Sequence, residues 1–149
     1  MTGYQEIYTD PSYFGQIIIN TSSHIGNYGT VEDEQESSSP QISGVIINEY
    51  SEIYSRSNSD ESLEDYFIKN NTVAIYDIDT RKLVKYIRDK GAMNAIISSE
   101  SQDVEKLKSS LDKVPSMKNL ELSSKVTTEK EYEFGDKNSK IKIAVLDLG

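Results

Sequence analysis

The sequence contains no cysteine. This absence excludes disulfide bonds, thiolate metal sites and a cysteine nucleophile from the chain. Histidine is nearly absent too, and the single residue, His24, has no orienting partner that the sequence identifies. A general base needs such a partner, so we interpret His24 as a solvent-facing loop residue. Apolar runs are only a few residues long, which predicts neither a transmembrane span nor a signal peptide.

Positive charge is in short supply as well. Sixteen Lys and Arg residues stand against 25 Asp and Glu residues, which gives a net charge of -9. An acidic surface repels phosphate backbones and anionic lipids, so we expect no nucleic-acid and no membrane partner, and a cytoplasmic location. The chain has no Gly-rich phosphate loop and no His/Cys metal cluster. The acids at 32–36 lack the ligand pattern of an EF-hand, which favours a solvated, mobile loop.

The hydrophobic periodicity of the 149 residues predicts one α/β domain. Strands are expected at 16–21, 43–50, 73–76 and 94–97, and helices at about 60–69, 79–90 and 103–114. Asn58 and Glu61 have the spacing of a capping box, and Leu63, Tyr66 and Phe67 should form the buried stripe of the first helix. The segment 73–97 has the order strand, helix, strand, for which a right-handed crossover is expected.

The first twenty residues form a turn-rich polar segment that leads into the strand at 16–21. Asp10, Pro11 and Ser12 have turn chemistry, and the isoleucines at 17–19 suit a strand that is buried on both faces. The glycines Gly26 and Gly29 predict a tight loop after it. A shaped loop that presents side chains and an ordinary surface turn both fit this pattern.

An Asp-x-Asp-Thr pattern follows the strand at 73–76. Asp77 and Asp79 resemble the nucleophile and general acid of haloacid-dehalogenase-like hydrolases, which use Mg²⁺. That family places Thr four positions after the first Asp, whereas position 81 is Arg81 here. The competing interpretation is structural: Asp79 or Thr80 caps the helix and Arg81 pairs locally.

Several short motifs along the chain point to one family. They resemble, in order, the N-terminal domain of the small (glutamine-hydrolysing) subunit of carbamoyl phosphate synthase. The matching segments are 2–6, 9–13, 15–16, 25–29, 78–81 with Leu83, 88–94, 115–117 and 126–128. The chain departs from the family pattern at Ser22-Ser23, where the family usually has Tyr-Pro.

The resemblance implies a swivelling β/β/α domain, in which barrel-like mixed sheets are covered by helices. Residues 1–137 would form this domain without its first strands, and residues 138–149 would be the stub of the first strand of a class I glutamine amidotransferase domain. Met1 falls inside the family's domain, so we expect either a fragment or a reading frame begun at an internal Met. Such a chain should expose a sheet edge and behave poorly in isolation.

The resemblance also implies a function. The intact enzyme makes carbamoyl phosphate from glutamine, bicarbonate and two ATP, for pyrimidine and arginine synthesis. The expected partners are the large subunit, which uses ATP and Mg, the amidotransferase domain and L-glutamine. By position, Ser12 is the residue placed near the bound glutamine. No cofactor is expected in this chain, and without the family's catalytic Cys it should be an inactive scaffold and docking domain. The alternative is a free-standing interaction module that kept the fold.

Overall fold

The protein is an α/β structure in the computed structural model, which describes residues 3–149. Met1 and Thr2, which begin the first predicted domain and the first family motif, lie outside the described residues. The strands are β1 (Ile17–Ile25), β2 (Gly44–Tyr50) and β3 (Val73–Ile75), and they form a parallel sheet in the order β1-β2-β3. The α-helices are α1 (Tyr4–Thr9), α2 (Leu63–Lys69), α3 (Thr80–Lys90), α4 (Val104–Leu111) and α5 (Ser123–Val126). Short 3-10 helices are η1 (Pro11–Tyr13) and η2 (Glu32–Glu34).

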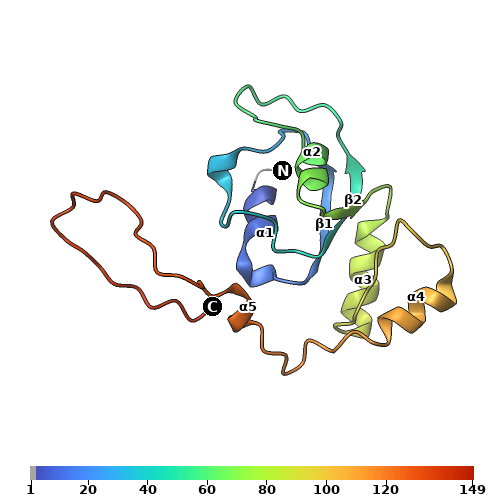
Figure 1. The fold of residues 1–149 in the computed structure, drawn as a ribbon. Helices are drawn as coiled ribbons and strands as arrows, with labels where there is room; N and C mark the ends of the chain where they lie inside the picture. Colours follow the sequence, from blue (N-terminus) through green and yellow to red (C-terminus); the bar gives the residue numbers. More distant parts are fainter. Residues whose placement is uncertain (1–2) are drawn as a thin grey trace.

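The hydrophobic core lies between the sheet and the helices α1 and α2. Figure 1 shows α1 and α3 on opposite sides of the strands. Val45 and Ile47 are two positions apart on β2 and point to the same side, because side chains alternate along a strand. They meet the tyrosines of α1 and the apolar stripe of α2. The buried core residues are Tyr4, Tyr8, Ile25, Tyr28, Ile42, Val45, Ile47, Leu63, Tyr66 and Phe67.

Helices α2 and α3 confirm the predicted helical periodicity, but α2 begins at a later residue than predicted. Leu63, Tyr66 and Phe67 are the buried stripe of α2, as expected. The helix begins later than predicted, because the Ser62 side chain accepts a hydrogen bond from the Asp65 amide and so supplies the N-cap. The expected pair, Asn58 and Glu61, lies before this cap. Helix α3 begins after Asp79 and ends at Gly91, both as predicted.

Strand β1 differs from its prediction in length and burial. It extends to Ile25 and so includes His24, which was expected in a loop. The turn that follows is formed as predicted, since Gly29 donates its amide to the carbonyl of Gly26. Ile17, Ile18 and Ile19 are only half-buried, so the expectation of burial on both faces is wrong. The reason is that β1 is an edge strand, paired with β2 alone.

The predicted strand at 94–97 is absent from the described structure, so the predicted strand-helix-strand unit at 73–97 is not formed. Residues 95 and 96 are exposed, and β-branched residues form strands only where a face is buried. Ile97 nevertheless lies beside Gly44 of β2. The helix-linked parallel pair is instead β2-α2-β3.

The C-terminal third contributes little to the core. Helix α4 is shorter than the predicted 103–114, and Val104 and Val114 are exposed. Residues 138–149 form neither a helix nor a strand, and in Figure 1 they return along a long loop toward α5. Two hydrogen bonds to Asp147 connect them: the Thr128 amide donates to its carboxylate at 2.8 Å, and the Thr127 hydroxyl donates to its carbonyl at 3.2 Å. Among the helices of residues 3–149, none has the length and apolar character required to cross a bilayer.

Candidate functional site

Ser12 lies in the middle of η1, directly after α1. The turn forms because Asp10 has extended backbone angles and its carboxylate accepts a hydrogen bond from the Ser12 amide, 2.8 Å away. Pro11 occupies the first helical position, where its missing N–H costs no hydrogen bond. The amide of Tyr13 donates to the carbonyl of Asp10 and closes the turn. The main chain around Ser12 is therefore fixed by its neighbours.

In the part of the chain that the structure describes, the hydroxyl of Ser12 does not help to hold this turn. Ser12 is exposed, and within residues 3–149 its hydroxyl makes no hydrogen bond. The groups of Ser12 that do bond are its amide, which donates to Asp10, and its carbonyl, which accepts from the side chain of Gln16 at 3.2 Å. Within the described residues, the Ser12 side chain therefore makes no hydrogen bond that would stabilise this turn. The hydroxyl is free to meet a ligand.

Helix α1 anchors this turn to the core. Tyr4 and Tyr8 are fully buried, and their rings are 5.8 Å apart. The Tyr4 hydroxyl donates to the carbonyl of Gly29, and the Tyr8 hydroxyl donates to Asn20 on β1. The Tyr28 hydroxyl accepts from the Tyr4 amide at 3.3 Å. Burial raises the pKa of both α1 tyrosines well above the usual range, so these hydroxyls stay protonated donors.

Gln5 completes the anchor by binding the main chain of Val31 in both directions. Its Nε2 donates to the Val31 carbonyl at 2.9 Å, and its Oε1 accepts from the Val31 amide at 2.8 Å. The acidic loop that follows is therefore held more firmly than the predicted mobile loop. Glu34 in this loop also pairs with Arg56, which lowers the pKa of Glu34 through the hydrogen bond between the two side chains.

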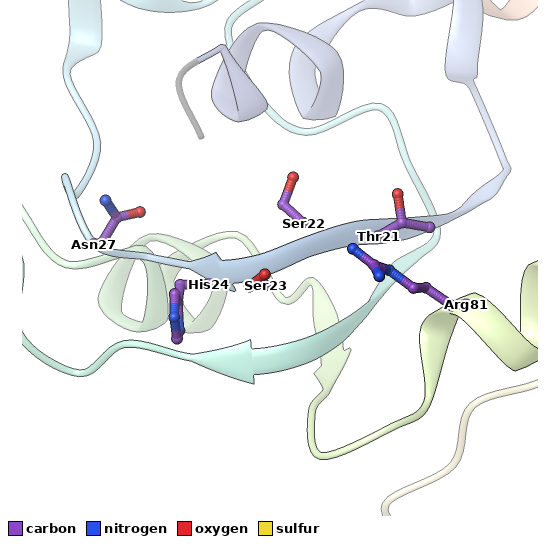
Figure 2. A pocket seen from close by; sticks show the side chains of 6 residues that line it. All are labelled: Thr21, Ser22, Ser23, His24, Asn27 and Arg81. Atoms are coloured by element: carbon purple, nitrogen blue, oxygen red, sulfur yellow. The ribbon is translucent and has the colours of Figure 1, made fainter.

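A second polar feature is an open depression of about 540 Å³ beside β1. Figure 2 shows its lining, which comes from the end of β1, the turn after it and the first turn of α3. The lining residues are Thr21, Ser22, Ser23, His24, Asn27 and Arg81. These side chains are distant in sequence, and the packing of α3 against β1 brings them together.

Two residues of this lining, His24 and Arg81, have contacts that differ from those predicted. His24 is exposed, as expected, but it lies on a strand and has a partner: its Nδ1 is 3.2 Å from a carboxylate oxygen of Glu49 on β2. The two residues meet only because the parallel register of β1 and β2 places Glu49 opposite His24, and the sequence does not reveal that register. Arg81 was expected to pair locally, and among the described residues it forms no ion pair.

Asp77 and Asp79 occupy structural positions. The Asp79 carboxylate accepts a hydrogen bond from the Lys82 amide at 2.9 Å and so caps α3, which confirms the helix cap of the structural interpretation but not the local pairing of Arg81. Asp77 has a positive φ of 61°, and its amide donates to the carbonyl of Asn48 on β2. Both acids are exposed. No group of three potential metal ligands occurs in the part of the chain that the structure describes, and this includes the acidic segment 32–36.

The comparison with protein families gives one match that covers most of the chain. The model of the carbamoyl-phosphate synthase small chain, CPSase domain, matches residues 1–97. Curated proteins called carbamoyl phosphate synthase small chain are similar over longer stretches. The protein from Synechococcus sp. is 45% identical over 134 residues, which cover 90% of this chain and 34% of that protein.

Two further relatives with the same name are matched along the entire chain. The protein from Aquifex aeolicus is 41% identical, and the match covers 100% of this chain and 43% of that protein. The protein from Chlorobaculum tepidum is also 41% identical, with coverage of 100% and 41%. The chain thus spans less than half the length of the curated relatives it matches. On this evidence the chain belongs to the family of the carbamoyl-phosphate synthase small chain, CPSase domain.

Proposed function

We propose that the chain is the N-terminal scaffold and docking domain of a glutamine-dependent carbamoyl phosphate synthase small subunit. In this proposal the assembled enzyme converts glutamine, bicarbonate and two ATP to carbamoyl phosphate. The chain itself is not catalytic, because it has no cysteine to serve as the nucleophile of glutamine hydrolysis. ATP and Mg act in the large subunit, and this chain needs no cofactor of its own. Family membership supports this proposal.

The observation that carries the proposed glutamine contact is the free hydroxyl of Ser12. The turn is rigidly built by Asp10 and Pro11, yet the serine side chain is exposed and unbonded among residues 3–149. A hydroxyl can both donate to and accept from the polar groups of an amino acid. We assign Ser12 to one side of the L-glutamine site, with the amidotransferase domain on the other side. One such hydrogen bond contributes about 1 kcal/mol.

The same proposal extends to the domain organisation. Residues 1–137 form the swivelling β/β/α domain, and residues 138–149 are the stub of the first strand of the amidotransferase domain. Ile141, Ile143 and Val145 occupy alternate positions, and each is more than 70% exposed, at 76%, 82% and 84%. Alternating apolar residues form a stable strand when a neighbouring sheet covers them. The partner sheet in this proposal belongs to the amidotransferase domain.

The docking role is tested by mixing the purified chain with the large subunit of a carbamoyl phosphate synthase. We expect a complex in analytical ultracentrifugation and no release of glutamate from glutamine by the chain alone. A folded monomer that does not bind the large subunit would contradict the docking role and favour a free-standing interaction module. Glutamate release by the chain alone would contradict the non-catalytic role.

The role of Ser12 is tested in a small subunit that joins this chain to an amidotransferase domain. Replacing Ser12 with Ala should raise the KM for glutamine about fivefold and leave kcat nearly unchanged, since one hydrogen bond of about 1 kcal/mol is lost. The matched control is Ser109→Ala, because Ser109 is exposed on α4. Equal KM values for the two variants would remove Ser12 from the glutamine site. That result would leave the proposed docking role in place, because docking is tested by a separate experiment.

A further inference from the structure

The polar depression beside β1 lies at an interruption in the sheet. Asn20 pairs with Ile47, and the next β1 residue in register is His24, opposite Glu49. Thr21, Ser22 and Ser23 therefore stand opposite a single β2 residue. Such bulges redirect side chains away from the regular alternation and are common next to functional sites. Here the redirected residues all carry hydroxyls.

Arg81 supplies the positive charge of the depression. Its side chain is exposed and extends from the first turn of α3 toward β1, as Figure 2 shows. In residues 3–149 no carboxylate lies within 4.0 Å of its guanidinium. Arg56 gives the contrast, because both of its terminal nitrogens bind Glu34. An arginine without a carboxylate partner is conspicuous in a chain with 25 acids and a net charge of -9.

Among the described residues that line the depression, none is acidic. Glu49 lies close to the depression but is not part of its lining; it contacts His24, which is. The depression thus combines one unpaired guanidinium with the hydroxyls of Thr21 and Ser23. A guanidinium donates two parallel hydrogen bonds to a carboxylate or phosphate group, and hydroxyls can donate to the remaining oxygens.

We propose that this depression binds a small oxyanion through Arg81, with the hydroxyls of Thr21 and Ser23 as further donors. Phosphate and carboxylate groups share the required chemistry. The site is separate from the proposed glutamine contact, since Ser12 is not part of its lining. It therefore stands or falls independently of the proposed function.

The test is a titration of the ¹⁵N-labelled chain with phosphate and, separately, with acetate, at constant ionic strength. Chemical shifts of the Arg81 Nε–H and of the amides of Thr21 and Ser23 report binding. We expect saturable shifts with a Kd on the order of 1 mM for at least one of the two anions. Tighter binding of phosphate points to a phosphorylated compound as the occupant, and tighter binding of acetate points to a carboxylate compound. Shifts that chloride reproduces, or that do not saturate with either anion, would overturn the proposal.

Matched variants separate this site from general charge effects. Arg81→Gln should weaken binding at least about tenfold, because charge-assisted hydrogen bonds are lost. Arg88→Gln removes the same charge from an exposed position later in α3 and should leave the Kd unchanged. Thr21→Val removes one hydroxyl and should weaken binding severalfold. Unchanged core shifts show that each variant folds, and equal losses for the two arginine variants would refute the site.

Discussion

The clasp between Gln5 and Val31 gives the most direct test of how α1, and with it the Ser12 turn, is held. Gln5 is 1% exposed, and its amide group makes a donor and an acceptor hydrogen bond to the main chain of Val31. Replacing Gln5 with Met keeps the length of the side chain and removes both hydrogen bonds. The substitution therefore isolates polar pairing from packing.

The expected cost follows from the groups left behind. The Val31 amide and carbonyl both lose their partner, and a buried group left unpaired costs about 1–3 kcal/mol. Val31 is only half-buried, so water reaches it in part and the lower end of that range applies. We expect a total loss of about 2–3 kcal/mol. For a chain of this size that loss lowers Tm by about 5–10 °C.

Urea unfolding followed by circular dichroism measures this loss. Gln102→Met is the control, because Gln102 is exposed and precedes α4. It should change the free energy of unfolding by less than about 0.5 kcal/mol. Hydrogen exchange of the Val31 amide should also become faster in Gln5→Met. If both variants have the same stability, the clasp contributes nothing and our reasoning on how α1 is anchored is refuted.

Three further predictions concern the turn after β1 and the ionisable groups. Gly26→Ala should lower the free energy of unfolding by at least about 2 kcal/mol, since φ is +99° and an added Cβ would lie 2.7 Å from a main-chain oxygen. Gly15→Ala has open space around it and should lower the free energy of unfolding by only about 1 kcal/mol. The Arg56 contact lowers the pKa of Glu34, so this carboxylate adds stability above its unfolded value of 4.5, and the contribution is lost as pH falls through the folded pKa. Glu34→Gln should therefore flatten the acid side of the stability profile measured by urea unfolding, and an unchanged profile would contradict the pairing. Burial raises the pKa of Tyr66 to about 12, so the stability that its neutral hydroxyl contributes below pH 10 should be lost as the pH rises from 10 toward 12. A tyrosinate absorbance midpoint near pH 10 for every tyrosine would disprove this raised pKa.

Local sequence signals were sufficient for the elements whose stabilising contacts are close in sequence. The stripe Leu63, Tyr66 and Phe67 sets the buried face of α2, because residues three and four apart share one side of a helix. The Asp79 cap and Gly91 mark both ends of α3, because each acts on main-chain groups of the adjacent helical turn. The family motifs are also local, and the comparisons confirm the family that they indicated.

Elements that depend on distant contacts were predicted poorly. Helix α1 was missed, although Tyr4 and Tyr8 have the spacing of a helical face and could have revealed it. The segment reads as a turn because the hydrogen-bond partners of the Tyr4 amide and the Gln5 side chain, Tyr28 and Val31, lie more than twenty residues away. The strand expected at 94–97 is not formed for the opposite reason, since residues 95 and 96 are exposed and no strand of the described sheet pairs with this segment.

The sequence by itself determined the family, the absence of a cysteine nucleophile and the turn that carries Ser12. Each of these depends on residue identity or on neighbours within a few positions. Tertiary structure alone decided that the Ser12 hydroxyl is unbonded within residues 3–149, that His24 meets Glu49, and that Arg81 faces the interrupted stretch of β1. These features arise where strand register and helix packing bring distant residues together, and no local pattern encodes that geometry.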